Sequence, residues 1–273
     1  MRAVTFQAPG EVRVDEKPEP ELLAPDDAIV RVDASGICGS DLHIFHGRVQ
    51  IEPGFTIGHE FVGDVVASGD EVRGVAVGDR VLGTYCTACG HCFFCERGEF
   101  HKCDEGRVYG HGATLGSLQG AALFAGDVMG TGYHAIASRP LAAGESAAVL
   151  GRGPVGRCAV QAAQAAGAST VIAIDTVDER LRMAESCGAV PLHLTEDEPR
   201  AEVKKLTEGR GVDLAVDAVG HPDALDLACR LARKAGTVSA TGVYAERMEL
   251  HMGVVWIKAL TLETGHANVI KHV

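Results

Sequence analysis

The chain has 273 residues, a hydrophobic share of 46% and a formal net charge of −12. This length suits one large or two modest domains, and the hydrophobic share excludes an intrinsically disordered chain. The acidic balance disfavours nucleic acid and anionic membranes as partners, because both attract basic surfaces. No apolar run reaches the roughly 18 residues that a membrane-spanning helix needs, and Met1 to Glu16 carry no secretory signal. We therefore expect a globular cytoplasmic protein.

Short β-rich runs separated by glycine and proline occupy the first part of the chain, up to about residue 125. The clearest of these runs are Ala3–Gln7, Asp27–Ala34, Glu60–Ala67 and Asp79–Thr84. Such spacing is typical of a small barrel-like or partly open β domain. The sequence therefore predicts an N-terminal β domain over residues 1–125.

Beyond residue 125, expected strands alternate with expected helices. The strands are Ala147–Leu150, Thr170–Asp175, Leu214–Ala218 and Thr237–Thr241, and the helices are Val155–Ala166, Glu179–Cys187 and Ala224–Ala232. Alternation of this kind predicts parallel strands joined by crossover helices, which form a doubly wound sheet. The predicted fold class is therefore α/β, with the β domain followed by a doubly wound domain over residues 126–273.

Four of the nine cysteines stand close together in the pattern Cys89-x2-Cys92-x2-Cys95-x7-Cys103. Zinc binds four thiolates in a tetrahedron, with Zn–S distances of about 2.3 Å, and a tight loop can present them together. Four protein ligands leave no position for a substrate, so this site would be structural. Disulfides and an iron–sulfur cluster are the alternatives. Clustered cysteines without a secretory signal favour zinc.

A second set of residues has the donor types of a catalytic metal site. Cys38 lies in a glycine-bracketed turn, Gly36 to His43, that also carries hydroxyl, carboxylate and imidazole groups. The pair His59 and Glu60 follows Gly58. A thiolate, an imidazole and a carboxylate around zinc would leave the fourth position open to water or substrate. Taken alone, each of these residues is weak evidence for a metal site. An isolated cysteine, for example, is more often a small hydrophobic residue of the core.

These residues resemble the zinc signature of the medium-chain alcohol and polyol dehydrogenases, and the four-cysteine loop resembles that family's structural zinc loop. The resemblance implies a GroES-like β domain and a Rossmann domain. It also implies that Cys38, His59 and Asp127 bind the catalytic zinc, with Glu60 beside the metal. Asp127 stands where some members have a cysteine. Two zinc ions per chain are therefore expected.

The same resemblance assigns a proton relay to Ser40 and His43. The alternative for Ser40 is a helix N-cap, because serine hydroxyls accept hydrogen bonds from the first backbone N–H groups of helices. An imidazole, with an unperturbed pKa near about 6.5, suits proton transfer at neutral pH. In the implied mechanism zinc acidifies the alcohol, the relay carries the proton away, and hydride passes to a nicotinamide in a cleft between the domains.

A glycine-rich turn follows the expected strand Ala147–Leu150 and opens the next helix. It reads Gly151, Arg152, Gly153, Pro154, Val155, Gly156. In this context the three glycines allow a tight turn, close approach of a pyrophosphate and helix–strand packing. The helix start adds free N–H groups for the phosphates. A structural glycine-rich turn is the alternative.

Asp175 ends the next expected strand, 19 residues after Gly156. A carboxylate there accepts hydrogen bonds from the adenosine ribose and repels a 2′-phosphate, so NAD is expected over NADP. Arg180, close in sequence, weakens that preference slightly. By resemblance, Thr131 would lie near the nicotinamide and Val219 near the coenzyme.

The chain is shorter than the family pattern at two places. A segment of the family pattern is absent between Gly120 and Ala121, and the chain ends at Val273, where the family pattern continues. The leading hypothesis is a zinc- and NAD-dependent dehydrogenase of secondary alcohols, diols or polyols, with an alcohol or carbonyl substrate. The alternative is a non-catalytic or impaired relative, a zinc-stabilised dinucleotide-binding protein with a structural or regulatory role. The family implies a homodimer or homotetramer.

Overall fold

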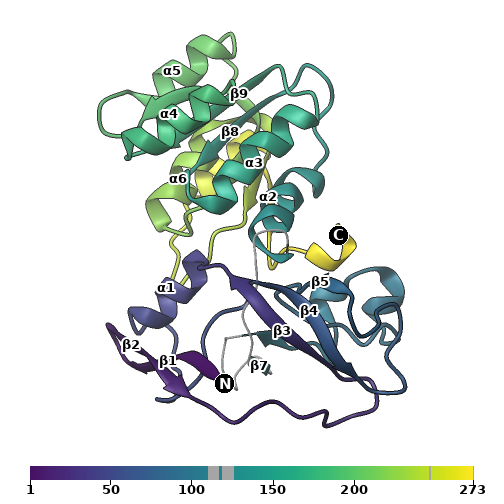
Figure 1. Cartoon of the computed structure of the whole chain (residues 1–273). Helices are drawn as coiled ribbons and strands as arrows, with labels where there is room; N and C mark the ends of the chain where they lie inside the picture. The colour runs from purple at the N-terminus through teal and green to yellow at the C-terminus, as the bar shows by residue number, and fades with distance from the viewer. Residues whose placement is uncertain (110–116, 119–125, 246, 273) are drawn as a thin grey trace. The chain divides into compact units, whose positions relative to one another are not determined.

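The computed structural model describes residues 1–109, 117–118, 126–245 and 247–272. These residues form two compact units (Figure 1). The first unit comprises Met1–Asp127 with Val269–Lys271, and the second comprises Val128–Asn268 with His272. The predicted domain boundary at residues 125 and 126, and the junction of Gly120 with Ala121, involve residues outside the described ranges.

The described residues of the first unit form three small sheets. Strands β1 (Arg2–Ala8) and β2 (Glu11–Glu16) form an antiparallel hairpin. Strands β3 (Ala28–Ser35), β4 (Phe61–Ser68) and β5 (Arg80–Leu82) form an antiparallel sheet in that order. Strands β6 (Val108–Tyr109) and β7 (Ser117–Leu118) are parallel. The predicted β domain of short strands is confirmed.

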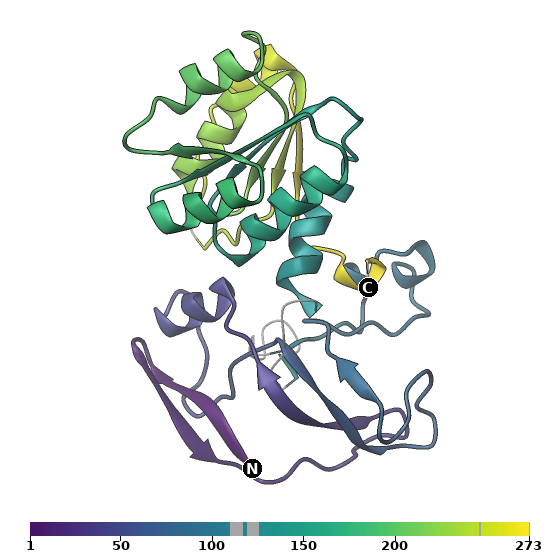
Figure 2. The ribbon, with the colours of Figure 1, turned by 45° about the horizontal axis from the view of Figure 1, so that its top comes forward.

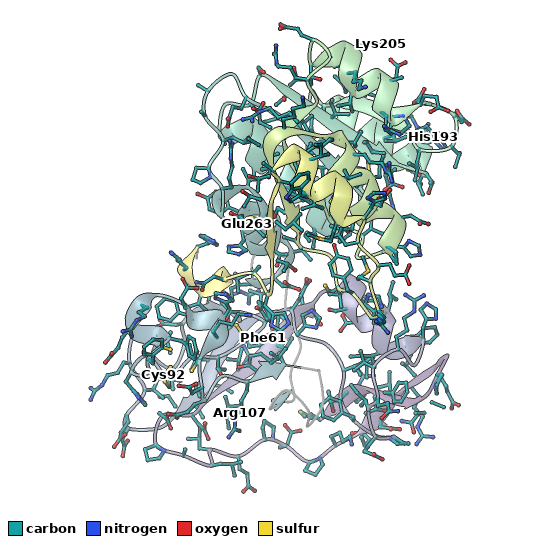
Figure 3. The ribbon with its side chains drawn as sticks, turned by 180° about the vertical axis from the view of Figure 1, so that it is seen from behind. Phe61, Cys92, Arg107, His193, Lys205 and Glu263 are labelled. Carbon is teal, nitrogen blue, oxygen red and sulfur yellow. The ribbon has the colours of Figure 1, made fainter. Side chains whose placement is uncertain are left out.

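Alternation along β4 builds part of the core of the first unit. Phe61, Gly63 and Val65 are buried, whereas the residues between them are only partly buried, as expected for a strand with one face on a core. The Phe61 ring, labelled in Figure 3, meets Tyr109 edge-on with 5.6 Å between ring centroids. This core supports the start of β4, which directly follows His59 and Glu60.

The described part of the first unit also contains four short helical segments. They are α1 (Gly39–Phe45) and the 3-10 turns η1 (Cys95–Arg97), η2 (Phe100–Lys102) and η5 (Val269–Lys271). Each is too short to be stable alone in water, so its conformation depends on the contacts around it. Cysteines of the two predicted metal sites lie at these segments: Cys38 is the N-cap of α1, Cys95 opens η1 and Cys103 is the C-cap of η2.

A six-stranded parallel sheet forms the centre of the second unit, with strand order β10-β9-β8-β11-β12-β13. The strands are β8 (Ser146–Leu150), β9 (Thr170–Asp175), β10 (Val190–His193), β11 (Val212–Asp217), β12 (Ala232–Ala240) and β13 (Thr261–Thr264). The chain starts at the central β8, winds outwards to β10, then returns to β11 and winds the other way. This order is that of a Rossmann fold, so the predicted fold class is confirmed.

Helices cover both faces of this sheet (Figure 2). The helices α2 (Val128–Ala137), α3 (Pro154–Ala165) and α4 (Asp178–Ser186) contribute to one hydrophobic cluster, and α5 (Pro199–Leu206), α6 (Pro222–Leu231) and α7 (Met252–Lys258) contribute to the other. Within β8, Ala147 and Val149 belong to the first cluster, and Ala148 and Leu150 to the second. A strand covered on both faces has no polar side, which explains its continuous apolar run.

The observed elements differ from the predicted ones at several places. Strand β12 begins at Ala232, five residues before the predicted start. Helix α2 was not predicted, since it contains Gly130 and Gly132 and glycine disfavours helices. A Cβ at Gly132 would lie 2.5 Å from the Cys158 Cβ of α3, so this glycine permits close helix packing. No helix among the described residues is long and apolar enough to cross a bilayer.

Candidate active site

The four-cysteine loop brings its sulfur atoms together. The Sγ atoms of Cys89, Cys92, Cys95 and Cys103 all lie within 4.8 Å of one another. Cys95 opens η1, Cys103 directly follows η2 as its C-cap, and the backbone N–H of Cys89 donates to the Cys103 Sγ at 3.2 Å. Cys92 is labelled on this loop in Figure 3. None of the nine cysteines, all of which fall in the described parts of the chain, forms a disulfide.

The surroundings of these thiols suit thiolate ligands. Backbone N–H groups of Asp104 and Cys95 lower the pKa of Cys92 to about 6, because such donors stabilise the anion. Burial raises the pKa of Cys95 to about 12. A thiol of that kind loses its proton when a cation binds beside it, since metal ligation requires the thiolate. The loop therefore fits a zinc ion with four sulfur ligands.

A second cluster gathers the predicted catalytic ligands within the first unit. Cys38 is the N-cap of α1, His59 and Glu60 directly precede β4, and Asp127 directly precedes α2. Donor atoms of all four residues lie within 4.8 Å of one another. The Asp127 Oδ2 lies 3.2 Å from the Cys38 Sγ and 3.1 Å from the His59 Nε2.

Buried negative charge dominates this cluster. Burial lowers the pKa of His59, but hydrogen bonds to Asp127 and Asp41 outweigh burial and raise it to about 12. Burial and the Asp127 carboxylate raise the pKa of Glu60 to about 7. Glu60 is 0% exposed, and neither of its carboxylate oxygens has a hydrogen-bond partner among the described residues. A buried set of this composition calls for a cation, and its sulfur, nitrogen and oxygen donors fit zinc.

Asp41, to which the sequence analysis assigned no role, orients two of these ligands. Its Oδ2 accepts a 2.8 Å hydrogen bond from the Cys38 N–H, and its Oδ1 lies 3.1 Å from the His59 Nδ1. A carboxylate on Nδ1 leaves Nε2 as the nitrogen that faces a metal. The spacing of Cys38 and Asp41 could have predicted this contact, because an acidic residue three positions after a helix N-cap closes a capping box.

We expect Asp41→Asn to weaken zinc binding at this cluster by about 10- to 100-fold. An amide keeps the shape but has one acceptor oxygen, so it cannot serve both the Cys38 N–H and the His59 Nδ1–H. Zinc retention against a graded series of chelators measures the effect. Asp70→Asn, which changes an exposed aspartate of the same unit, is the control. Equal retention in both variants would remove Asp41 from the metal site.

The two predicted relay residues occupy the same helix. Ser40 lies at the second position of α1 and His43 in its last turn. The Ser40 Oγ lies 3.2 Å from the His59 Nε2, so its hydroxyl borders the ligand cluster. The His43 Nδ1 lies 3.3 Å from the Arg48 Nη1, and partial burial followed by the charge of Arg48 lowers the pKa of His43. The N-cap of α1 is Cys38, so the N-cap alternative for Ser40 is wrong.

The glycine-rich turn has the predicted strand–turn–helix context. It follows β8, and Gly153 is the N-cap of α3, with Pro154 at its first position and Val155 next. Gly151 has φ +83°. A Cβ at Gly156 would lie 1.8 Å from the Gly151 carbonyl oxygen, so only glycine allows this packing. The turn therefore presents the N-terminus of a twelve-residue helix to an anion.

Asp175 ends β9 and lies beside this turn. Its Oδ2 accepts a 2.5 Å hydrogen bond from the Arg152 N–H, and its Oδ1 accepts from the N–H groups of Thr176 and Val177 at 2.7 and 3.0 Å. The Arg180 Nη1 lies 3.6 Å from the Asp175 Oδ2. The structure thus brings Asp175, Arg180 and the glycine-rich turn together within the second unit.

Thr131 and Val219 are the remaining predicted coenzyme residues. Thr131 lies in α2, and Val219 follows β11. A Cβ at Gly151 would lie 2.6 Å from the Val219 Cγ2, so Val219 touches the first glycine of the fingerprint. Arg152 also supports the turn, because its buried side chain, 2% exposed, donates from Nη1 to the Gly156 carbonyl oxygen. No local pattern signals that burial.

Comparisons with known proteins agree with these arrangements. Residues 24–129 match the family model of the alcohol dehydrogenase GroES-like domain, and residues 154–268 match that of the zinc-binding dehydrogenases. A medium chain reductase/dehydrogenase, ucsI, of Acremonium sp is 35% identical over 91% of this chain and 95% of its own length. The probable zinc-binding alcohol dehydrogenase Rv1895 of Mycobacterium tuberculosis is 37% identical over 89% of this chain and 68% of its own.

A solved structure is similar across almost all of the chain. The alcohol dehydrogenase TADH from Thermus sp. ATN1 is 40% identical, with a TM-score of 0.93, and the match covers 98% of this chain and 85% of that one. Fold, family models and relatives therefore agree over both units. The chain belongs to the medium-chain dehydrogenase/reductase family, in its branch of zinc-dependent alcohol and polyol dehydrogenases.

Proposed function

We propose that the chain is a zinc- and NAD-dependent dehydrogenase that interconverts a secondary alcohol, diol or polyol with its carbonyl product. The observation that carries this proposal is the cluster of Cys38, His59, Glu60 and Asp127, whose donor atoms lie within 4.8 Å of one another. Three of these residues suffice to bind a zinc ion and leave one position open. A structural site has no use for an open position.

The four-cysteine loop supports a second, structural zinc. Its four sulfur donors would complete a tetrahedron without help from substrate or water. The glycine-rich turn and Asp175 support the NAD part of the proposal, because they combine a helix N-terminus for the pyrophosphate with a carboxylate for the ribose. Two zinc ions per chain and one coenzyme are therefore expected.

The residues of the first unit have distinct roles in the proposed reaction. Bound zinc supplies Lewis-acid activation of the alcohol hydroxyl, and bound NAD supplies the hydride acceptor. Cys38, His59 and Asp127 would hold the metal, and the buried Glu60 carboxylate would balance its charge. The Ser40 hydroxyl, beside the His59 Nε2, would accept the alcohol proton, and His43 would receive it further along α1.

The deciding experiment combines metal analysis with an activity panel. The purified chain is assayed for zinc content, then for NADH and NADPH formation with alcohols, diols, polyols and threonine. We expect about two zinc ions per chain and NADH formation from at least one substrate class. Zinc-loaded protein that binds NADH, yet neither oxidises an alcohol nor reduces a carbonyl, would favour a non-catalytic role.

The coenzyme preference is expected to depend on Asp175. We expect Asp175→Asn to raise the ratio of NADP to NAD use by about 10- to 100-fold, because a neutral amide no longer repels a 2′-phosphate. Arg180, 3.6 Å from the Asp175 carboxylate, would then be available to the phosphate. The ratio of kcat/KM values for the two coenzymes measures the change.

Asp178→Asn is the matched control for this change, since its side chain is 76% exposed and lies three residues further on. The control should keep the coenzyme preference of the unchanged chain. A wild-type chain that uses both coenzymes equally would show that Asp175 does not discriminate between them.

The cytoplasmic location and the dimeric or tetrameric state also stay predictions. Light scattering coupled to size-exclusion chromatography tests the oligomeric state.

A further inference from the structure

The carboxyl ends of β11 and β12 are joined through one buried carboxylate, that of Asp217. Asp217 ends β11 and is 0% exposed. Its Oδ1 accepts hydrogen bonds from the N–H groups of Val219 and Gly220 at 2.8 and 3.2 Å. Its Oδ2 accepts a 2.6 Å hydrogen bond from the hydroxyl of Tyr244. A buried carboxylate needs such donors, because without them its charge is costly.

Tyr244 reaches Asp217 from the loop that follows β12. The backbone carbonyl of Asp217 also accepts from the N–H groups of Thr241 and Gly242, at 3.0 and 2.9 Å. The loops after the two strands touch directly, since a Cβ at Gly220 would lie 2.3 Å from the Val243 carbonyl oxygen. Through these hydrogen bonds and this contact, Asp217 connects residues 219–220 to residues 241–244.

The tied loops lie against the glycine-rich turn. Val219, whose N–H is held by Asp217, also contacts Gly151 through its Cγ2 methyl group. Ligands of parallel α/β sheets bind at the carboxyl ends of the strands, where these loops lie. The position of Val219 therefore sets one wall of the turn that is proposed to receive the coenzyme phosphates.

We propose that Tyr244 is a positioning residue for the coenzyme, and this inference rests on the proposed dinucleotide function. Its hydroxyl satisfies the second oxygen of Asp217, so that the first oxygen keeps Val219 against Gly151. Without the Tyr244 hydroxyl, the buried Asp217 carboxylate would turn to other hydrogen-bond donors, and the loop that carries Val219 would shift. Tyr244 itself contacts no reacting atom in this scheme.

The test is Tyr244→Phe, which removes one oxygen and keeps the ring. We expect the Kd for NADH, measured by calorimetry on the zinc-loaded chain, to rise about tenfold, the equivalent of one hydrogen bond to a charged group. The KM for NAD should rise in parallel, whereas zinc content and the KM for alcohol at saturating NAD should not change. Tyr133→Phe, a tyrosine that is 50% exposed, should bind NADH as the unchanged chain does.

A second variant separates positioning from stability. Asp217→Asn should weaken NADH binding as well, and the double variant should bind no more weakly than Asp217→Asn alone, because the hydroxyl acts through that carboxylate. A Tyr244→Phe chain with a lower Tm but an unchanged Kd would overturn the inference, as would multiplicative effects in the double variant. If the unchanged chain fails to bind NADH, the proposed NAD-dependent function itself would be wrong.

Discussion

Replacing His59 with alanine should lower alcohol-dependent NADH formation by at least about 10³-fold, because the lost imidazole is one of three proposed ligands of the zinc that activates the alcohol. His59 is 1% exposed, and its Nε2 lies 3.1 Å from the Asp127 carboxylate. Zinc content should fall from about two ions per chain to about one.

The measurement for His59→Ala needs to separate lost chemistry from lost structure. NADH binding by the second unit should persist, since the glycine-rich turn and Asp175 belong to that unit. His46→Ala, which removes an exposed imidazole at the end of α1, is the control and should retain both zinc ions. Unchanged zinc content together with unchanged turnover in His59→Ala would contradict the assignment of His59 as a ligand.

Cys95→Ser is expected to destabilise the first unit strongly, because it removes one ligand of the structural zinc. Cys95 is 5% exposed and its Sγ lies within the four-sulfur cluster. A ligand bound at 1,000 times its Kd stabilises the folded state by about 4 kcal/mol, so loss of the structural zinc should cost at least about that much. The Tm should fall by about 10 °C or more.

Cys86→Ser provides a matched comparison for this prediction. Cys86 is also 5% exposed and stands three residues before Cys89, but it lies outside the four-sulfur cluster. This variant should keep both zinc ions and lose only the smaller contribution of a buried thiol. Metal analysis and thermal unfolding measure the two effects together. Similar falls in Tm for both variants, with equal zinc content, would show that the loop does not depend on metal.

The α/β class and the sequence of strands and helices in the second unit could be predicted because the relevant signals are local. Hydrophobic runs and a glycine-rich turn reveal β8, α3 and β9 to within a residue or two. Short elements such as β10 escaped prediction, since four residues carry too little periodicity. The order of the strands in the parallel sheet could not be predicted from the sequence either, because it depends on how the crossover helices pack on the folded sheet.

The residues of the candidate site also fall into those that local spacing predicts and those that only the folded chain brings together. The four-cysteine loop lies within 15 residues, so spacing alone predicts a shared metal. Asp127 is 68 residues from His59, and only the family resemblance connects them. Asp41 and Tyr244 act by orienting other groups, and the distances involved exist only in the folded chain. Their roles as metal and coenzyme partners stay predictions until the variants above are measured.

Metal binding and the order of helix α1 are coupled at the start of this helix. Cys38 is both a proposed zinc ligand and the N-cap of this seven-residue helix, and Asp41 both closes the capping box and faces His59. A helix this short frays readily when nothing anchors it. Metal occupancy and helical order in residues 38–45 are therefore two descriptions of one equilibrium, in which losing the ion loosens the helix and fraying the helix releases the ion.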